Sequence, residues 1–276
     1  MPQKRVLTIQ DYSCMGRCSL TVAIPTLSAL GIETIGLPTA VLSNHTQFAS
    51  WTFIDLTSSL IPSVEKWKSY NHHFDFLYTG YLATNQIEIV ASILTRLKEE
   101  GTKVYIDPAF ADNGKMYPGF QDEHPLLMRK LIAIADYVKP NLSEACFLTG
   151  TPIPASGKVS KEEAMELAKK IQSLGAKNVI LSGLSFEEGK LDVLLLEEGK
   201  GFSLVEGDKL EGLYHGTGDL FSSAVVGKLT LGKDLKSAVE DSHNYIASSI
   251  RYTVEDKLDG LLYGVEFEKA LPELLK

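Results

Sequence analysis

Short apolar runs alternate with amphipathic stretches along most of the chain. Helical periodicity runs over about residues 19–30, 86–100 and 161–174, and a glycine follows the end of each stretch, as is common at helix C-termini. Strands that alternate with helices of this length predict βαβ units, and therefore a parallel sheet covered on both faces. The runs with strand character are residues 6–10, 34–42, 74–79, 104–107, 137–139 and 178–182.

The later part of the chain departs from this alternation. Residues 192–197 and 202–205 are strand-like and are separated by a turn at 199–201, which predicts a hairpin and an antiparallel edge. Three helices are expected after it, at about 218–231, 235–252 and 265–274. The predicted fold class is α/β, a three-layer α/β/α sandwich with a mostly parallel central sheet. No repeat or linker interrupts the chain, so a single domain over residues 1–276 is predicted.

Two connections carry local signals. Residues 109–123 are polar and contain Gly114, Pro118 and Gly119, and a segment of this length without periodicity is typical of a functional loop or lid. Ser143 is predicted to cap the helix that follows Pro140, with Glu144 in its first turn.

The composition and charge of the chain disfavour some classes of binding partner. The chain has 276 residues, of which 44% are hydrophobic and 22% charged, as in ordinary globular proteins. The net charge of −8 and the absence of a Lys/Arg run argue against nucleic acid as a partner. No apolar stretch reaches the roughly 18 residues that span a bilayer. The three cysteines suit a reducing compartment, and Cys14 and Cys18 are expected to be free thiols, so a cytoplasmic location is predicted.

The segment His215-Gly216-Thr217-Gly218-Asp219 precedes an apolar helical stretch. Two glycines around a threonine allow successive N–H groups to point the same way, and the helix adds the positive end of its dipole. This pattern suits a phosphate. A carboxylate beside an anion site makes chemical sense if Asp219 accepts a proton from an attacking hydroxyl. The alternative is a glycine-rich turn in which Asp219 is an ordinary first-turn residue.

Several other phosphate-binding signatures are missing. The chain has no Gly-x4-Gly-Lys-Ser/Thr, no His-Arg-Asp or Asp-Phe-Gly, and no Gly-x-Gly-x-x-Gly after the first strand. These absences exclude a P-loop enzyme and a protein kinase, and they weaken a Rossmann dehydrogenase.

Six segments in a fixed order carry a family resemblance. Residues 216–221 (Gly-Thr-Gly-Asp-Leu-Phe) resemble the C-terminal signature of the ribokinase-like superfamily, and residues 43–48 (Ser-Asn-His-Thr-Gln-Phe) resemble the early signature of its pyridoxal kinase branch. The other four are residues 10–11, 79–82, 107–108 and 139–144. The resemblance covers the chain from residue 6 to about 252. It implies ATP-dependent phosphorylation of the hydroxymethyl group of a vitamin B6 compound, which is pyridoxal, pyridoxamine or pyridoxine.

The resemblance also implies roles at the reaction centre. Asp219 would be the catalytic base, and the backbone of Gly216, Thr217 and Gly218 would form the anion hole.

For the substrate, the resemblance implies a pyridine site. Asp11, Ser43 and Thr46 would hold the polar edge of the ring, Gln47 belongs to the same predicted site, and Tyr81 would offer a flat face. Tyr81 could also be a core residue. Many family members have Ser where this chain has Asp11, and the added negative charge motivates the hypothesis that pyridoxamine is preferred.

For the nucleotide, the resemblance implies that Asp107, Asn141 and Glu144 serve the ATP phosphates and Mg²⁺, directly or through water, with Asp107 and Glu144 as the metal-binding carboxylates. Ser182 and Thr217 would lie near the nucleotide. Without the resemblance, Asp107 could simply cap a turn. A requirement for a monovalent cation, usually K⁺, and a homodimer are also implied.

Three other functions remain open. A hydroxymethylpyrimidine kinase of thiamine synthesis shares the fold, but usually has Cys where this chain has Asp219. A sugar or nucleoside kinase is disfavoured because its Asn/Asp-Gly-Gly pattern is missing near the N-terminus. A non-catalytic pyridoxal-phosphate-binding protein could keep the fold, but it would have no use for Asp219 beside an intact anion hole.

Overall fold

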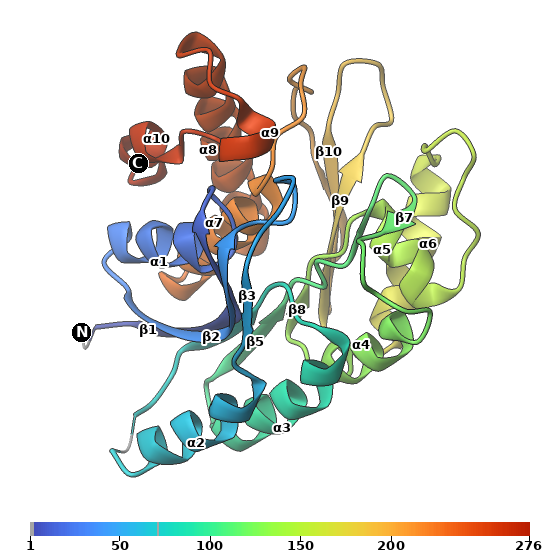
Figure 1. The fold of residues 1–276 in the computed structure, drawn as a ribbon. Helices are drawn as coiled ribbons and strands as arrows, with labels where there is room; N and C mark the ends of the chain where they lie inside the picture. The colour runs from blue at the N-terminus through green and yellow to red at the C-terminus, as the bar shows by residue number, and fades with distance from the viewer. Residues whose placement is uncertain (1–2, 71) are drawn as a thin grey trace. The chain divides into compact units, whose positions relative to one another are not determined.

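The structure is a computed structural model that describes residues 3–70 and 72–276. Its strands and helices alternate along most of the chain (Figure 1). Two compact units can be separated: unit 1 comprises Met1–Gly80, Leu97–Thr102 and Leu210–Lys276, and unit 2 comprises Tyr81–Arg96 and Lys103–Lys209. The single domain expected from the sequence stays a prediction.

Unit 1 is built around strand β1 (Arg5–Met15), which lies between two parallel neighbours, β2 (Glu33–Asn44) and β4 (Phe76–Thr79). Strand β3 (Phe53–Asp55) pairs antiparallel with β2. Residues 6–11 of β1 are all buried, as expected for a parallel strand covered on both faces. The helices of this unit are α1 (Leu20–Ala29), α2 (Thr57–Lys68), α7 (Thr217–Thr230), α8 (Leu235–Glu255), α9 (Gly260–Tyr263) and α10 (Phe267–Leu274).

Unit 2 contains β8 (Tyr137–Val138), which is parallel to both β5 (Lys103–Ile106) and β9 (Asn178–Leu184). Strand β10 (Asp192–Glu197) runs antiparallel to β9 and forms a hairpin with β11 (Gly201–Val205). The remaining elements are the 3₁₀ turn η1 (Thr84–Gln86), α3 (Ile87–Leu97), the small hairpin β6 (Ala111–Asp112) and β7 (Lys115–Met116), α4 (His124–Ile132), α5 (Leu142–Thr149) and α6 (Lys161–Ser173).

These strands confirm the predicted fold class. Nine of them belong to one mostly parallel sheet, with antiparallel strands at its edges, and the α/β order of elements agrees with the alternation read from the sequence. None of the described helices is long and apolar enough to cross a membrane.

One predicted helix cap is wrong. Asn141, and not Ser143, is the N-cap of α5, because Asn141 Oδ1 accepts the Glu144 N–H at 2.9 Å. Glu144 Oε2 in turn accepts the Asn141 N–H at 2.9 Å, which completes a capping box. Ser143 lies inside the helix, and its hydroxyl accepts the N–H of Gly114 at 2.8 Å.

Candidate active site

The glycine-rich segment leads directly into the N-terminus of α7. Gly216 caps the helix with φ of 75°, a conformation that favours glycine. A Cβ atom at Gly216 would lie 1.8 Å from the carbonyl oxygen of Arg17. The close approach of the loop before α7 to the loop before α1 therefore also requires glycine. The N–H groups of Thr217 and Gly218 belong to the first turn of α7, where helix geometry leaves N–H groups without an intrahelical acceptor. This arrangement suits an anion.

Asp219 lies in the same first turn and is tied to a second helix. Its Oδ2 accepts the backbone N–H of Ser19 at 2.8 Å, and Ser19 is the N-cap of α1. The N-termini of α1 and α7 therefore both lie at this carboxylate. The predicted base is thus fixed by contacts with both helices.

Asp11 lies near the same point, within β1. It is buried, and its two oxygens accept hydroxyl hydrogen bonds from Ser19 at 2.5 Å and Ser13 at 2.8 Å. Burial raises the pKa of Asp11, and the two serine hydrogen bonds act in the opposite direction. The pKa of the neighbouring Cys18 thiol is raised well above its usual range by burial and by the charges of Asp11 and Asp219, so the thiol stays protonated.

The segment 43–48 is arranged around a buried imidazole. His45 Nε2 lies 2.7 Å from the Leu262 carbonyl oxygen, and His45 Nδ1 lies 3.3 Å from the Gln47 N–H. Since a carbonyl only accepts and an N–H only donates, these partners select the neutral tautomer with the proton on Nε2. His45 also stacks on His215, with ring centroids 3.9 Å apart. Burial lowers the pKa of His45, and burial together with His45 lowers that of His215 to about 4.

The predicted substrate residues of this segment remain untested. Ser43, Thr46 and Gln47 are exposed. The Ser43 hydroxyl donates to Asn44 Oδ1 at 2.7 Å and accepts the Thr52 N–H at 2.9 Å, so it is already engaged in a local turn.

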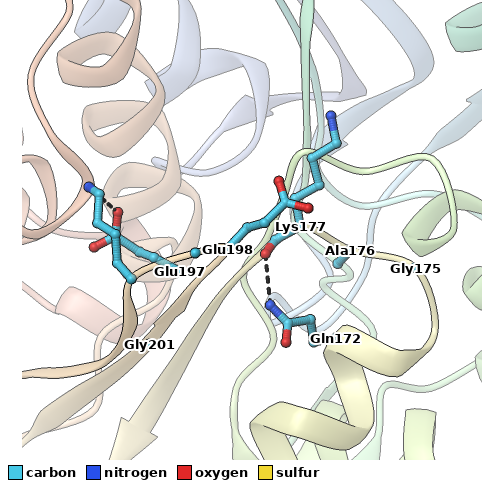
Figure 2. Close-up of a pocket in the computed structure, with 9 residues that line it drawn as sticks. Gln172, Gly175, Ala176, Lys177, Glu197, Glu198 and Gly201 are labelled. Atoms are coloured by element: carbon cyan, nitrogen blue, oxygen red, sulfur yellow. Dashed lines mark hydrogen bonds and ion pairs between the residues drawn. The ribbon is translucent and has the colours of Figure 1, made fainter.

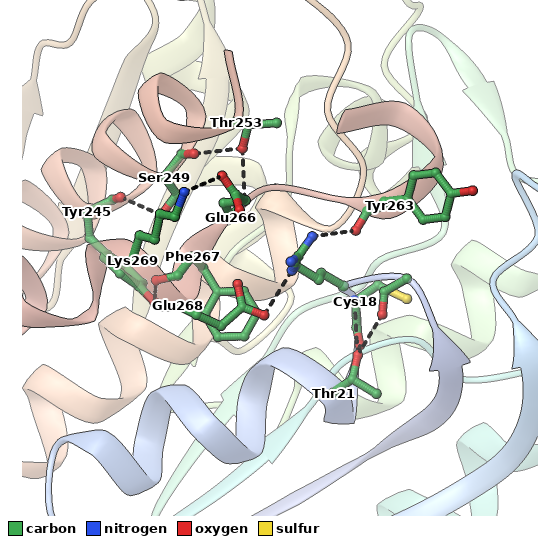
Figure 3. Close-up of polar contacts among 12 residues, drawn as sticks. Cys18, Thr21, Tyr245, Ser249, Thr253, Tyr263, Glu266, Phe267, Glu268 and Lys269 are labelled. Atoms are coloured by element: carbon green, nitrogen blue, oxygen red, sulfur yellow. Dashed lines mark hydrogen bonds and ion pairs between the residues drawn. The ribbon is translucent and has the colours of Figure 1, made fainter. Parts of the chain in front are cut away.

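The C-terminal segment of unit 1 fixes the loops just described. The Arg17 side chain contacts Glu268 Oε1 at 2.9 Å and the Tyr263 carbonyl at 3.2 Å (Figure 3). A Cβ at Gly264 would lie 2.7 Å from Arg17 Cβ, so the backbone passes directly over that side chain. The Gly260 carbonyl accepts the His215 N–H at 3.0 Å. Residues 260–268 therefore contact the loop before α1 and the loop before α7.

In unit 2, the predicted nucleotide residues gather where β5 and β8 end. Asp107 is buried and forms an ion pair with Lys139 at 2.7 Å, in which the Lys139 side chain is only 7% exposed. Burial and the negative charge of Asp107 together raise the pKa of Glu144 to about 8, against the opposing effect of Lys139. Lys139 is a site residue that the sequence did not single out.

Glu144 also holds the backbone of the loop that follows β5. Its Oε1 accepts the Phe110 N–H at 3.0 Å, while the Asn141 Nδ2 group donates to the Ala111 carbonyl at 2.7 Å. The Ser182 N–H donates to the Pro140 carbonyl at 3.0 Å. The structure thus brings Asn141, Glu144 and Ser182 into one hydrogen-bonded region.

The metal-binding prediction can be tested against these contacts. Within residues 3–70 and 72–276, no group of three or more His, Cys, Asp or Glu side chains forms a ready metal site. Asp107 and Glu144 are hard oxygen donors of the kind Mg²⁺ prefers, and a cation there would relieve the repulsion between them. Glu144 already accepts N–H groups on both oxygens, so these residues fit a hydrated ion held through water.

Glu144 should make the stability of the protein depend on pH. Its folded-state pKa of about 8 lies above the ordinary value of 4.5, so the folded state binds more protons between these values. We therefore expect the free energy of unfolding to fall as pH rises from about 5 to 8, by up to about 1.4 kcal/mol per pH unit. Urea denaturation across this range measures it. Glu144→Gln should flatten the slope, and an unchanged slope would contradict the assignment.

Tyr81 lies in an aromatic group of unit 2. It is partly buried, and its ring centroid lies 5.3 Å from that of Phe120, which in turn lies 4.0 Å from His124. Burial lowers the pKa of His124 to about 4, so this imidazole is neutral at physiological pH. A role for Tyr81 against a substrate ring stays a prediction.

A cavity of about 520 Å³ lies elsewhere in unit 2 (Figure 2). It is open and is lined by the end of α6, the segment that precedes β9 and the turn between β10 and β11, with Gln172, Lys177 and Glu198 among its residues. None of the predicted site residues lines it, so it is not the candidate active site.

Comparisons with known proteins find a matching family and similar solved structures. The sequence model of the family described as phosphomethylpyrimidine kinase matches residues 22–259. A Bacteroides thetaiotaomicron protein assigned to the phosphomethylpyrimidine kinases, crystallised in a form with pyridoxal, is 35% identical, with a TM-score of 0.93 over 99% of this chain and 96% of that one.

Two curated relatives carry different names. A pyridoxal kinase of Dictyostelium discoideum is 29% identical over 82% of this chain and 78% of its own length. A hydroxymethylpyrimidine/phosphomethylpyrimidine kinase of Aquifex aeolicus is 28% identical over 89% and 93%. The match to the family covers most of the chain, and the chain therefore belongs to the phosphomethylpyrimidine kinase family of ribokinase-like proteins.

Proposed function

We propose that the protein phosphorylates the hydroxymethyl group of a vitamin B6 compound with ATP. The observation that carries the proposal is Asp219, a carboxylate in the first turn of α7, directly after the Gly216–Gly218 backbone. Asp219 accepts the proton of the substrate hydroxyl, whose oxygen attacks the γ-phosphorus of ATP, and the bond to ADP breaks. The N–H groups at the start of α7 stabilise the charge on the transferred group.

Three observations support a B6 compound over hydroxymethylpyrimidine. The Bacteroides relative, at 35% identity, was crystallised with pyridoxal, and the Dictyostelium relative is a pyridoxal kinase. This chain also has Asp219 where hydroxymethylpyrimidine kinases usually have Cys. The Aquifex relative keeps the pyrimidine as the second candidate substrate. In this proposal Asp11, Ser43, Thr46, Gln47 and Tyr81 form the substrate site.

The nucleotide is assigned to the polar region of unit 2. In this proposal Asn141 and Ser182 bind the nucleotide there, Thr217 of α7 serves it from unit 1, and Asp107 and Glu144 hold Mg²⁺ through water. When bound, this ion neutralises charge on the phosphates of ATP. The K⁺ requirement stays a prediction.

A homodimer is proposed because apolar side chains are exposed at the edge of the unit 1 strands. Trp51 is 45% exposed, Phe53 52% and Ile54 60%, and β3 is a short edge strand. Exposed apolar groups on a sheet edge mark a surface that a second copy can cover. Sedimentation velocity would measure the mass in solution, and a monomer at micromolar concentration would contradict the dimer.

The proposed function is tested by ADP production with Mg·ATP and K⁺ in the presence of pyridoxal, pyridoxamine, pyridoxine or hydroxymethylpyrimidine. We expect turnover of at least one B6 compound and weak or no turnover of the pyrimidine. Turnover of the pyrimidine alone would contradict the B6 proposal and would favour a hydroxymethylpyrimidine kinase of thiamine synthesis. A failure to turn over any of the four, combined with binding of pyridoxal phosphate, would favour the non-catalytic alternative.

A further inference from the structure

Ser19 has a backbone conformation that its residue type does not explain. Its φ is 49° and its ψ is −133°, a combination of backbone angles that residues other than glycine rarely adopt. It is also the N-cap residue of α1, where serine usually accepts a hydrogen bond from the first turn, yet its side chain makes no such bond. Strain of this kind persists only where surrounding contacts hold it.

The contacts that hold Ser19 lead to two carboxylates. The Ser19 hydroxyl donates to Asp11 Oδ1 at 2.5 Å, and the Ser19 N–H donates to Asp219 Oδ2 at 2.8 Å. Ser19 is 4% exposed and Asp11 is 5% exposed, so solvent competes little for these bonds. A single buried residue thus joins the predicted base to a predicted substrate-binding carboxylate.

We propose that Ser19 is a positioning residue whose hydroxyl holds its backbone in place, so that its N–H orients the Asp219 carboxylate while the same hydroxyl holds the Asp11 carboxylate. The proposal rests on the proposed function, in which Asp219 is the base. The two roles can be separated because they use different atoms. A glycine at position 19 can keep the backbone conformation without the hydroxyl. Alanine loses the hydroxyl bond to Asp11 and still carries a Cβ, which disfavours a positive φ.

The orientation of Asp219 is tested by comparing kcat in three variants. Ser19→Ala should lower kcat by at least about ten-fold, because the N–H leaves Asp219 and the base is misaligned. Ser19→Gly should lose much less, because its backbone still favours this conformation. Ser13→Ala is the matched control: it removes the other donor to Asp11, at 2.8 Å, and leaves the Ser19 N–H in place. Equal kcat values for Ser19→Ala and Ser19→Gly would overturn the orienting role.

The effect on Asp11 gives a second measurement. All three variants remove a hydroxyl that favours the carboxylate, so the pKa of Asp11 should rise in each, and the acid limb of the kcat/KM profile should move to higher pH. The other titratable groups that face Asp11 are His45, the Cys18 thiol and, through Ser19, Asp219. Loss of packing alone would lower kcat/KM evenly at every pH.

A titration without substrate separates this proposal from the proposed function. The ¹³C shift of the Asp11 carboxyl, followed against pH in the wild type and in Ser19→Ala, reports its pKa directly. The two hydrogen bonds of Ser19 form a bridge between Asp11 and Asp219. If the wild type phosphorylates no B6 compound, the proposed function fails. A raised Asp11 pKa in Ser19→Ala would still support the Ser19–Asp11 half of this bridge. An unchanged Asp11 pKa would overturn that half, whatever the activity.

Discussion

Asp219→Asn should lower kcat by about 10²- to 10⁴-fold while the protein remains folded. Asparagine has nearly the same shape, and its amide oxygen can still accept the Ser19 N–H that Asp219 Oδ2 accepts at 2.8 Å. It cannot take up the proton of the substrate hydroxyl at neutral pH. KM should change less than kcat, because proton transfer belongs to the transition state and not to ground-state binding.

The measurement is steady-state ADP production with the preferred B6 compound, together with the melting temperature of each variant. Asp208→Asn is a suitable control, since it makes the same substitution in an exposed ion pair with Lys190. The control should keep its activity. An Asp219→Asn variant within about three-fold of the wild type would show that the reaction does not need this base, and would favour catalysis by the anion hole alone.

Much of the fold was predictable because it depends on local patterns. The alternation of apolar runs and helical stretches, with glycines at helix ends, gave the α/β class and the hairpin of β10 and β11. Elements without such patterns were missed. Strand β3 has three residues that are all exposed, so no alternation marks it. Helix α4 (His124–Ile132) follows the polar segment 109–123 and was not separated from it.

The wrong cap of α5 shows how two local signals compete. Both Asn141 and Ser143 are residue types that cap helices. The spacing favours Asn141, because Glu144 stands three residues after it and can close a capping box. The same Glu144 also accepts backbone N–H groups on both oxygens, which favours a role through water over direct metal binding, the two roles expected from the sequence.

Only part of the candidate site can be read from the sequence. The segment 215–221 carries the proposed chemistry in consecutive residues, so a short motif is enough to indicate Asp219. The bridge through Ser19 was not visible, because it joins residues 11, 19 and 219 and depends on a positive φ that no pattern of serine indicates. Lys139 was missed for a similar reason, since its ion pair with Asp107 links the ends of two strands.

Gly216→Ala should be the most damaging small substitution in the chain. Alanine at φ of 75° costs about 1–2 kcal/mol by itself. The added Cβ would also lie 1.8 Å from the Arg17 carbonyl oxygen, so one of the two loops must move. Relief of such overpacking costs about 1–3 kcal/mol more. Because the same backbone forms the proposed anion hole, the displacement should lower kcat/KM by at least about a hundred-fold.

Gly232→Ala separates these two causes. Gly232 follows the other end of α7, has φ of 91°, and would place its Cβ where no atom lies within 4 Å. It should therefore show only the conformational cost, with a loss of about 1–2 kcal/mol in urea denaturation and little change in kcat/KM. The decisive quantity is the difference between the two variants in both measurements. If Gly216→Ala were no worse than Gly232→Ala, the contact with Arg17 would be unimportant, and the N-terminus of α7 would not need its close approach to that loop to bind phosphate.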